Sequence, residues 1–177
     1  WDETYLREQI RRNPLVTDPE RFTAERPFRL ACIQLATYDG TVYNVRKVLE
    51  KIGHLCDYVL WDEAWIGYNA FHPLFEGHSP MRLEQLNPDM PGLFSTQSVH
   101  KQGAGFSQAS QIHKRDEHIK GQKRFIEHKR FNESFLMNAS TSPFYPLFAS
   151  LDVNAKVHEG KAGEMLWDRC IELGIDA

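Results

Sequence analysis

The sequence predicts an α/β fold, a mostly parallel sheet flanked by helices. Residues 28–40 are apolar with little alternation and end in Asp39–Gly40, a pattern typical of a strand buried on both faces. Residues 41–55 place apolar side chains at helical spacing, and residues 58–64 form a second apolar run. Strand, helix and strand in this order make a βαβ unit, in which ligands bind beyond the carboxyl ends of the strands.

The segments around this unit are assigned from caps and breakers. Residues 1–13 read as a short helix that Thr4 caps and Pro14 ends, and residues 15–27 as a surface linker. The stretch 66–92 is rich in Pro, Gly, His and Asn, which favours a functional loop or short helices.

The second half of the chain adds a third strand, a basic stretch and helices. Residues 93–101 are a strand candidate that ends at Lys101. Residues 113–130 carry seven Lys/Arg against three Asp/Glu, which favours a solvated loop over a nucleic-acid site. Helical segments are expected at 131–137, at 140–157, where Ser-Thr-Ser-Pro suits a helix start, and at 160–177.

Composition narrows the class of protein. With 177 residues, 41% hydrophobic and 25% charged, the chain suits one folded domain or part of one. A net charge of -3 indicates no nucleic-acid partner, and no apolar run is long enough to suggest a membrane span. The three cysteines have no disulfide or zinc-site spacing, and the histidines form no helix-spaced pair with a carboxylate, so we expect no metal and a cytoplasmic location.

Two residues at predicted strand ends could carry chemistry. Asp62 follows an apolar strand between two tryptophans, where it is either an exposed cap or a desolvated carboxylate that needs a positive partner. Lys101 is either a solvated charge or a reactive amine, and the small residues after it leave space for a phosphate-bearing ligand. A lysine that forms a Schiff base and a carboxylate for the pyridinium nitrogen are the two groups that pyridoxal phosphate requires.

Four motifs then carry a resemblance to a known family. They are TYDGTVYN, WDEAWIGYNAFHPLF, TQSVHKQGAGFSQASQIH and STSPFYPLFASLDVNAK. Together they resemble the major, cofactor-binding domain of the bacterial pyridoxal-phosphate-dependent ornithine/lysine/arginine decarboxylases. The resemblance runs over nearly the whole chain and implies the aspartate-aminotransferase-like fold (fold type I).

The resemblance also implies roles for individual residues. The S-x-H-K motif makes Lys101 the lysine that binds the cofactor covalently, with Ser98 and His100 near its phosphate. The D-x-A-W motif makes Asp62 the partner of the pyridine nitrogen. It places Ala64 and Trp65 beside the cofactor.

The remaining implications concern assembly. The segment that begins at Ser140 and Thr141 would approach the cofactor of a neighbouring subunit, which implies a homodimer with a shared active site. Family members also have a wing domain and a C-terminal domain, which are absent from residues 1–177.

Ornithine is the expected substrate. The long segment HIKGQKRFIEHKRFN and the Gln after the reactive lysine resemble the ornithine enzymes, whose product would be putrescine. Lysine or arginine decarboxylase, a non-catalytic oligomerisation module and an aminotransferase stay as alternatives. Gly103, where a larger residue is expected, and Glu63, where a small one is common, depart from the family pattern.

Overall fold

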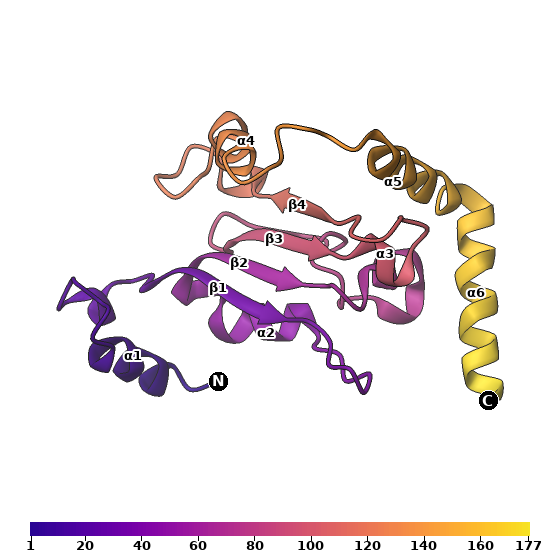
Figure 1. Cartoon of the computed structure of the whole chain (residues 1–177). Coiled ribbons are helices and arrows are strands. Elements are labelled where there is room, and N and C mark those ends of the chain that lie inside the picture. Colours follow the sequence, from indigo (N-terminus) through magenta and orange to yellow (C-terminus); the bar gives the residue numbers. More distant parts are fainter.

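The computed structural model describes residues 1–177 and contains one four-stranded sheet in the order β1-β2-β3-β4 (Figure 1). The strands are β1 (Phe28–Gln34), β2 (Cys56–Asp62), β3 (Gly92–Gln97) and β4 (Gln111–Arg115). The first three run parallel, and β4 pairs antiparallel with β3. The predicted α/β class with a mostly parallel sheet is therefore confirmed.

Helix α2 (Val45–Ile52) connects β1 to β2 and forms the predicted βαβ unit. The helix begins at Val45 because the Asn44 side chain caps it, accepting a hydrogen bond from the Lys47 backbone N–H at 3.0 Å. Its buried residues pack into the main core together with Leu35, Val59, Trp61 and Leu93. This core lies on one face of the sheet, the α2 face.

Strand β1 does not have the burial that its apolar sequence suggested. It pairs only with β2, and Ile33 is its single buried residue, while Leu30 is 45% exposed. The prediction of a strand buried on both faces was wrong, because Leu30, Cys32 and Gln34, which alternate onto the face away from the main core, are exposed.

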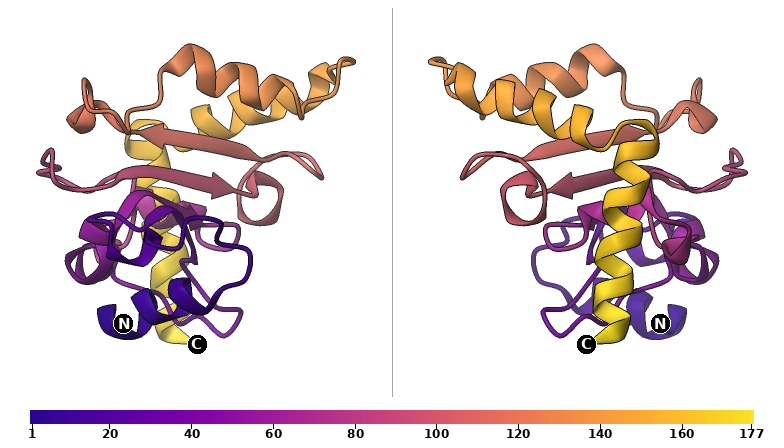
Figure 2. Two further views of the ribbon diagram at one scale, coloured as in Figure 1. Left: turned by 90° about the vertical axis from the view of Figure 1, so that its left-hand side faces the viewer. Right: turned by 90° about the vertical axis from the view of Figure 1, so that its right-hand side faces the viewer.

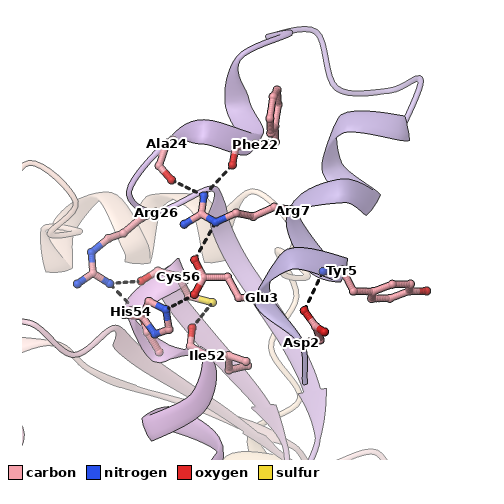
Figure 3. A network of polar contacts seen from close by, with 11 residues as sticks. Asp2, Glu3, Tyr5, Arg7, Phe22, Ala24, Arg26, Ile52, His54 and Cys56 are labelled. Carbon is pink, nitrogen blue, oxygen red and sulfur yellow. Dashed lines mark hydrogen bonds and ion pairs between the residues drawn. The ribbon is translucent and has the colours of Figure 1, made fainter.

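The N-terminal helix α1 (Glu3–Arg12) is held against the sheet by polar contacts (Figure 3). Arg7 Nη1 donates to the carbonyl oxygens of Phe22 and Ala24 at 2.7 and 2.8 Å, and His54 Nε2 lies 3.0 Å from Glu3 Oε2. The cap is Asp2, whose carboxylate accepts from the Tyr5 backbone N–H, so the predicted Thr4 cap was wrong. Between α1 and β1, only the short 3-10 helix η1 (Arg21–Thr23) interrupts the predicted linker.

The basic stretch is more ordered than a solvated loop. Its first residues belong to β4, and the 3-10 helix η5 (Glu117–Ile119) follows. Lys114 pairs with the buried carboxylate of Asp116, which also accepts from the Tyr58 hydroxyl at 2.8 Å. Arg124 Nη2 donates to the carbonyl oxygens of Pro88 and Met90 at 2.6 and 2.9 Å. The loop prediction was therefore wrong for these residues, whose charges serve local structure.

The opposite face of the sheet carries a smaller apolar cluster. Tyr58, Phe94 and Ile119 are buried there, with Phe131 of helix α4 (His128–Leu136) packed against them. The rings of Tyr58 and Phe94 stack at a centroid distance of 5.0 Å.

Helices α5 (Tyr145–Val157) and α6 (Gly160–Asp176) complete the chain. Helix α5 starts after Phe144, with Pro146 in its first turn, so the predicted start at Ser140 was wrong. Figures 1 and 2 show α4 and α5 beyond β4, and α6 crossing the carboxyl ends of the parallel strands. The Trp167 ring of α6 stacks on Tyr68 at 4.7 Å, in the 3-10 helix η3 (Gly67–Phe71). No helix combines the length and apolarity that crossing a bilayer requires.

Candidate functional site

Asp62 is the last residue of β2, at the carboxyl end of the parallel strands. It lies opposite Thr96 of β3 and is exposed. Its Oδ1 accepts a hydrogen bond from the Ala64 backbone N–H at 2.9 Å, whereas Oδ2 has no hydrogen-bond partner. One carboxylate oxygen is thus free to bind a ligand.

Lys101 lies in the short helix α3 (Val99–Gln102), which follows β3 at the same end of the sheet (Figure 1). The strand predicted to reach Lys101 ends at Gln97. The Lys101 Nζ is 4.5 Å from the ring centroid of Trp65, a cation–π contact, and it forms no ion pair. The Trp65 ring meets Tyr38 edge-on at 5.0 Å. The amine therefore rests on an aromatic surface beside the end of β2.

Ser98 and His100, which precede Lys101, differ in their side-chain hydrogen bonds. Ser98 occupies the N-cap position of α3, but its side chain forms no capping hydrogen bond. The His100 ring is engaged, since its Nδ1 lies 3.0 Å from the Ala109 carbonyl oxygen. Ser98 consequently has a free hydroxyl, and His100 has only Nε2 free.

A cavity of about 1450 Å³ opens at this end of the sheet, along β4. Asp62, Ala64 and Ser98 line it, together with Thr96 of β3. Lys101, Trp65 and His100 do not line it, although each follows a lining residue within three positions in the chain. The structure thus brings three of the predicted site residues onto one cavity.

Ser140 and Thr141 are not part of this group. They are exposed in the connection between α4 and α5, and neither lines the cavity. The only hydrogen bonds of the Ser140 side chain are to Ser142.

The sequence analysis missed a second polar group, on the α2 face of the sheet. Glu63 is fully buried, and its carboxylate accepts hydrogen bonds from Ser95, Gln97 and Asn69. Burial raises the pKa of Glu63 above the usual value for a glutamate, although the three hydrogen bonds oppose this. The alternation of side chains along a strand could have predicted this burial, because residue 63 must face the side of the sheet opposite to Asp62.

Gly103, the other departure from the family pattern, has a steric explanation. A Cβ at this position would lie 2.5 Å from Oδ1 of Asn154 in α5. That oxygen accepts a hydrogen bond from the Ala104 backbone N–H at 2.8 Å, and Ser150 Oγ accepts from the Phe106 N–H at 3.0 Å. Helix α5 therefore binds the backbone that follows Lys101, and the close approach requires a glycine.

Metal-ligating side chains are not gathered anywhere: no three His, Cys, Asp or Glu residues come together as a potential metal site. The candidate functional groups at this end of the sheet are the side chains of Asp62, Ser98 and Lys101.

Comparison with known proteins identifies the family. The profile described as "Orn/Lys/Arg decarboxylase, major domain" matches residues 1–177. The chain belongs to this family. It is 60% identical over its whole length to the constitutive ornithine decarboxylase of Escherichia coli (strain K12) and 58% identical to the ornithine decarboxylase of Haemophilus influenzae.

Solved structures give the same family. The lysine decarboxylase of Francisella novicida aligns with 98% of this chain at a TM-score of 0.78 and 33% identity, and this chain covers 21% of it. The chain likewise spans 24% of the two ornithine decarboxylases. Residues 1–177 thus correspond to about a quarter of the length of these relatives.

Proposed function

We propose that this chain is part of the cofactor-binding domain of a pyridoxal-phosphate-dependent decarboxylase that converts L-ornithine to putrescine and carbon dioxide. One observation carries the proposal: Asp62, with a free carboxylate oxygen, and Ser98, with a free hydroxyl, line one cavity, and the unpaired amine of Lys101 belongs to the short helix that Ser98 begins.

The residues present fit this cofactor. Pyridoxal phosphate needs an amine for its aldehyde, a carboxylate for its pyridinium nitrogen and donors for its phosphate. Lys101, Asp62 and Ser98 offer these three groups, and none of them is committed to an ion pair. When bound, the cofactor supplies the electron sink for loss of the substrate carboxylate.

Each residue then has a defined task. Lys101 would hold the cofactor through its amine. Asp62 would keep a proton on the ring nitrogen, because a carboxylate stabilises the adjacent positive charge. Trp65 covers one side of the amine and limits access of water, and Ser98 and Nε2 of His100 are the donors that we assign to the phosphate.

Ornithine is favoured over the other basic amino acids by the ranking of relatives. Those named ornithine decarboxylases share 53–60% identity with this chain, whereas those named lysine or arginine decarboxylases share 33–41%. The one-carbon difference between ornithine and lysine is selected by the pocket for the distal amine, and we assign most of that pocket to parts of the protein outside residues 1–177.

The assembly follows the same assignment. We infer a cytoplasmic homodimer in which Ser140 and Thr141 approach the cofactor of the partner subunit, and wing and C-terminal domains outside these residues. The exposure of both side chains supports this role, since they remain available to a partner.

The test is Lys101→Ala in the full-length protein. We expect loss of the visible absorption band that borohydride bleaches, and loss of at least about 99% of carbon dioxide release from labelled ornithine. Lys129→Ala, at an exposed lysine of the basic stretch that does not line the cavity, is the matched control and should change neither. A Lys101→Ala protein that kept both signals would overturn the assignment.

Asp62→Asn separates the role of the carboxylate from that of the lysine. This protein should still bind the cofactor but lose most decarboxylation, because an amide does not hold the ring nitrogen protonated. A wild-type protein that binds no cofactor would instead support the oligomerisation module, and accumulation of a keto acid would support an aminotransferase.

A further inference from the structure

Glu63 is a buried carboxylate without a cation. Its Oε1 accepts from Asn69 Nδ2 at 3.0 Å, and its Oε2 accepts from Gln97 Nε2 at 3.1 Å and from the Ser95 hydroxyl. Two amide NH2 groups and one hydroxyl converge on it, so both of its oxygens take part in hydrogen bonds. Burying a carboxyl group without an ion pair is costly, so such a group indicates a specific role.

The carboxylate sets the direction of the surrounding hydrogen bonds. Because Glu63 Oε2 accepts from Gln97 Nε2, the Gln97 amide turns its NH2 group toward Glu63 and its oxygen away. That oxygen then accepts from Gln111 Nε2 at 2.8 Å and from His113 Nε2 at 3.2 Å. His113 must therefore carry its proton on Nε2.

Asn69 provides independent support for this direction. Its Nδ2 donates both to Glu63 and to the His78 carbonyl oxygen at 3.1 Å, while its own Oδ1 is buried without a partner. The NH2 group of Asn69 therefore makes two hydrogen bonds while its oxygen makes none, which fixes Glu63 Oε1 as an acceptor.

The network also joins the segments that carry the candidate site. Glu63 lies between Asp62 and Ala64, Gln97 directly precedes Ser98, and Asn69 belongs to η3, which follows Trp65. The backbone N–H of Glu63 donates to the Thr96 carbonyl oxygen at 2.9 Å, so β2 and β3 are joined here by both backbone and side chains. Since alternate residues face opposite sides of a sheet, fixing Glu63 on the α2 face fixes Asp62 on the other.

We propose that Glu63 is a positioning residue of the cofactor site. Its buried carboxylate holds the ends of β2 and β3 in register, so that Asp62 and Ser98 face the cavity together, and it orients the chain of hydrogen bonds from Gln97 to His113. The functional part of this inference rests on the proposed function, whereas the direction of the hydrogen bonds does not.

Variants at positions 63, 97 and 95 test the direction of these hydrogen bonds. In Glu63→Gln, the His78 carbonyl oxygen still holds the Asn69 NH2 group in place, so the remaining side-chain oxygen at position 63 stays opposite Asn69 and the new NH2 group faces Gln97 Nε2. The Gln97 amide must then turn over and present its NH2 to His113. His113 then has to accept at Nε2 and carry its proton on Nδ1. The exchange Glu63→Gln with Gln97→Glu restores an acceptor at position 97 and should return His113 to the Nε2–H form. Ser95→Ala removes one donor, leaves Gln97 in place and is the matched control.

The experiment measures the protonated ring nitrogen of His113 by NMR of the full-length protein labelled with 15N-histidine. A His113→Gln variant identifies the signal. We expect Nε2–H in the wild type, in Ser95→Ala and in the exchange variant, and Nδ1–H in Glu63→Gln. The affinity for added pyridoxal phosphate should fall about tenfold in Glu63→Gln and return to within about threefold of wild type in the exchange variant.

The outcomes separate the two proposals. An Nδ1–H form in the wild type, which can be measured even if no variant folds, would overturn the inference. So would a Glu63→Gln protein with unchanged His113 and unchanged cofactor affinity. A borohydride-sensitive band that survives in Lys101→Ala would overturn the proposed function and leave the His113 result standing.

Discussion

The sheet region, residues 28–126, and the helical region, residues 128–177, are built in different ways. In the sheet region the apolar side chains of β2, β3 and α2 are buried in the main core on one face of the sheet and in a smaller cluster on the other. In the helical region only Ser150 and Gly163 are buried, although it contains many large apolar residues that are exposed, among them Leu136, Met137, Phe144, Tyr145, Phe148 and Ile175.

This difference teaches where the candidate site obtains its rigidity. All three candidate residues belong to the sheet region. Asp62 ends β2, Ser98 directly follows β3, and Lys101 lies in the next turn, and β2 and β3 are joined by backbone hydrogen bonds. The helical region contributes a few specific contacts, such as the bonds from Asn154 and Ser150 to the segment after Lys101. The core therefore holds the candidate site in place, and α5 adds two hydrogen bonds to the segment after Lys101.

The largest expected effect tests the core directly. Trp61 is fully buried in the main core, so Trp61→Ala should reduce the free energy of unfolding by about 3–5 kcal/mol. Leu173→Ala, at a residue of α6 that is 51% exposed, should change it by less than about 0.5 kcal/mol. Urea denaturation followed by circular dichroism measures both, and equal losses would contradict the comparison.

An intermediate loss of folding stability is expected when the contact between Gly103 of the sheet region and Asn154 of the helical region is disturbed. Gly103→Ala should cost about 1–3 kcal/mol, because its Cβ would lie 2.5 Å from Asn154 Oδ1 and 2.9 Å from the Val99 carbonyl oxygen. Part of this cost should disappear in the double variant with Asn154→Ala, which removes the first clash.

The control for this cycle is Gly174→Ala. No atom lies within 4 Å of a Cβ at position 174, so this change in α6 should be neutral or stabilising by up to about 1 kcal/mol. Strictly additive losses in the double variant would show that α5 does not bind the segment after Lys101.

The smallest effect concerns pH and the sheet region alone. Burial lowers the pKa of His118, whose Nε2 lies 3.0 Å from the Pro91 carbonyl oxygen. The unfolded chain then takes up a proton near pH 6.5 more readily than the folded chain, so this stability is present above pH 6.5 and is lost as the pH falls through the lowered pKa. His118→Gln keeps a donor and should reduce the loss of stability between about pH 7.5 and about pH 5.5. An unchanged pH dependence would contradict the assignment.

The sequence predicted the βαβ unit well, because α2 has apolar residues at helical spacing and β2 is a continuous apolar run. It did not reveal β4 (Gln111 to Arg115), in which Ile112 is the only apolar residue. Pairing with β3 stabilises a strand of this composition. The sequence of residues 111–115 alone does not predict that pairing.

The candidate site was predictable to a similar degree. Motifs located Asp62, Ser98 and Lys101, but the helix at Lys101 and the burial of Glu63 depend on contacts between distant residues. The proximity of Gly103 to Asn154, 51 residues later in the chain, is a tertiary packing relation of the same kind.

The antiparallel pairing of β3 and β4 also has a consequence for the order of folding. Gln97 pairs with Gln111, so the segment that carries Lys101 is the connection of a hairpin, whereas β1 and β2 meet only after a crossover that includes α2. Contacts close in sequence form fastest, because the entropy lost on closing a loop grows with its length. We therefore expect both ends of the Lys101 segment to be anchored before the parallel strands assemble, and this connection to be among the first parts of the domain to take shape.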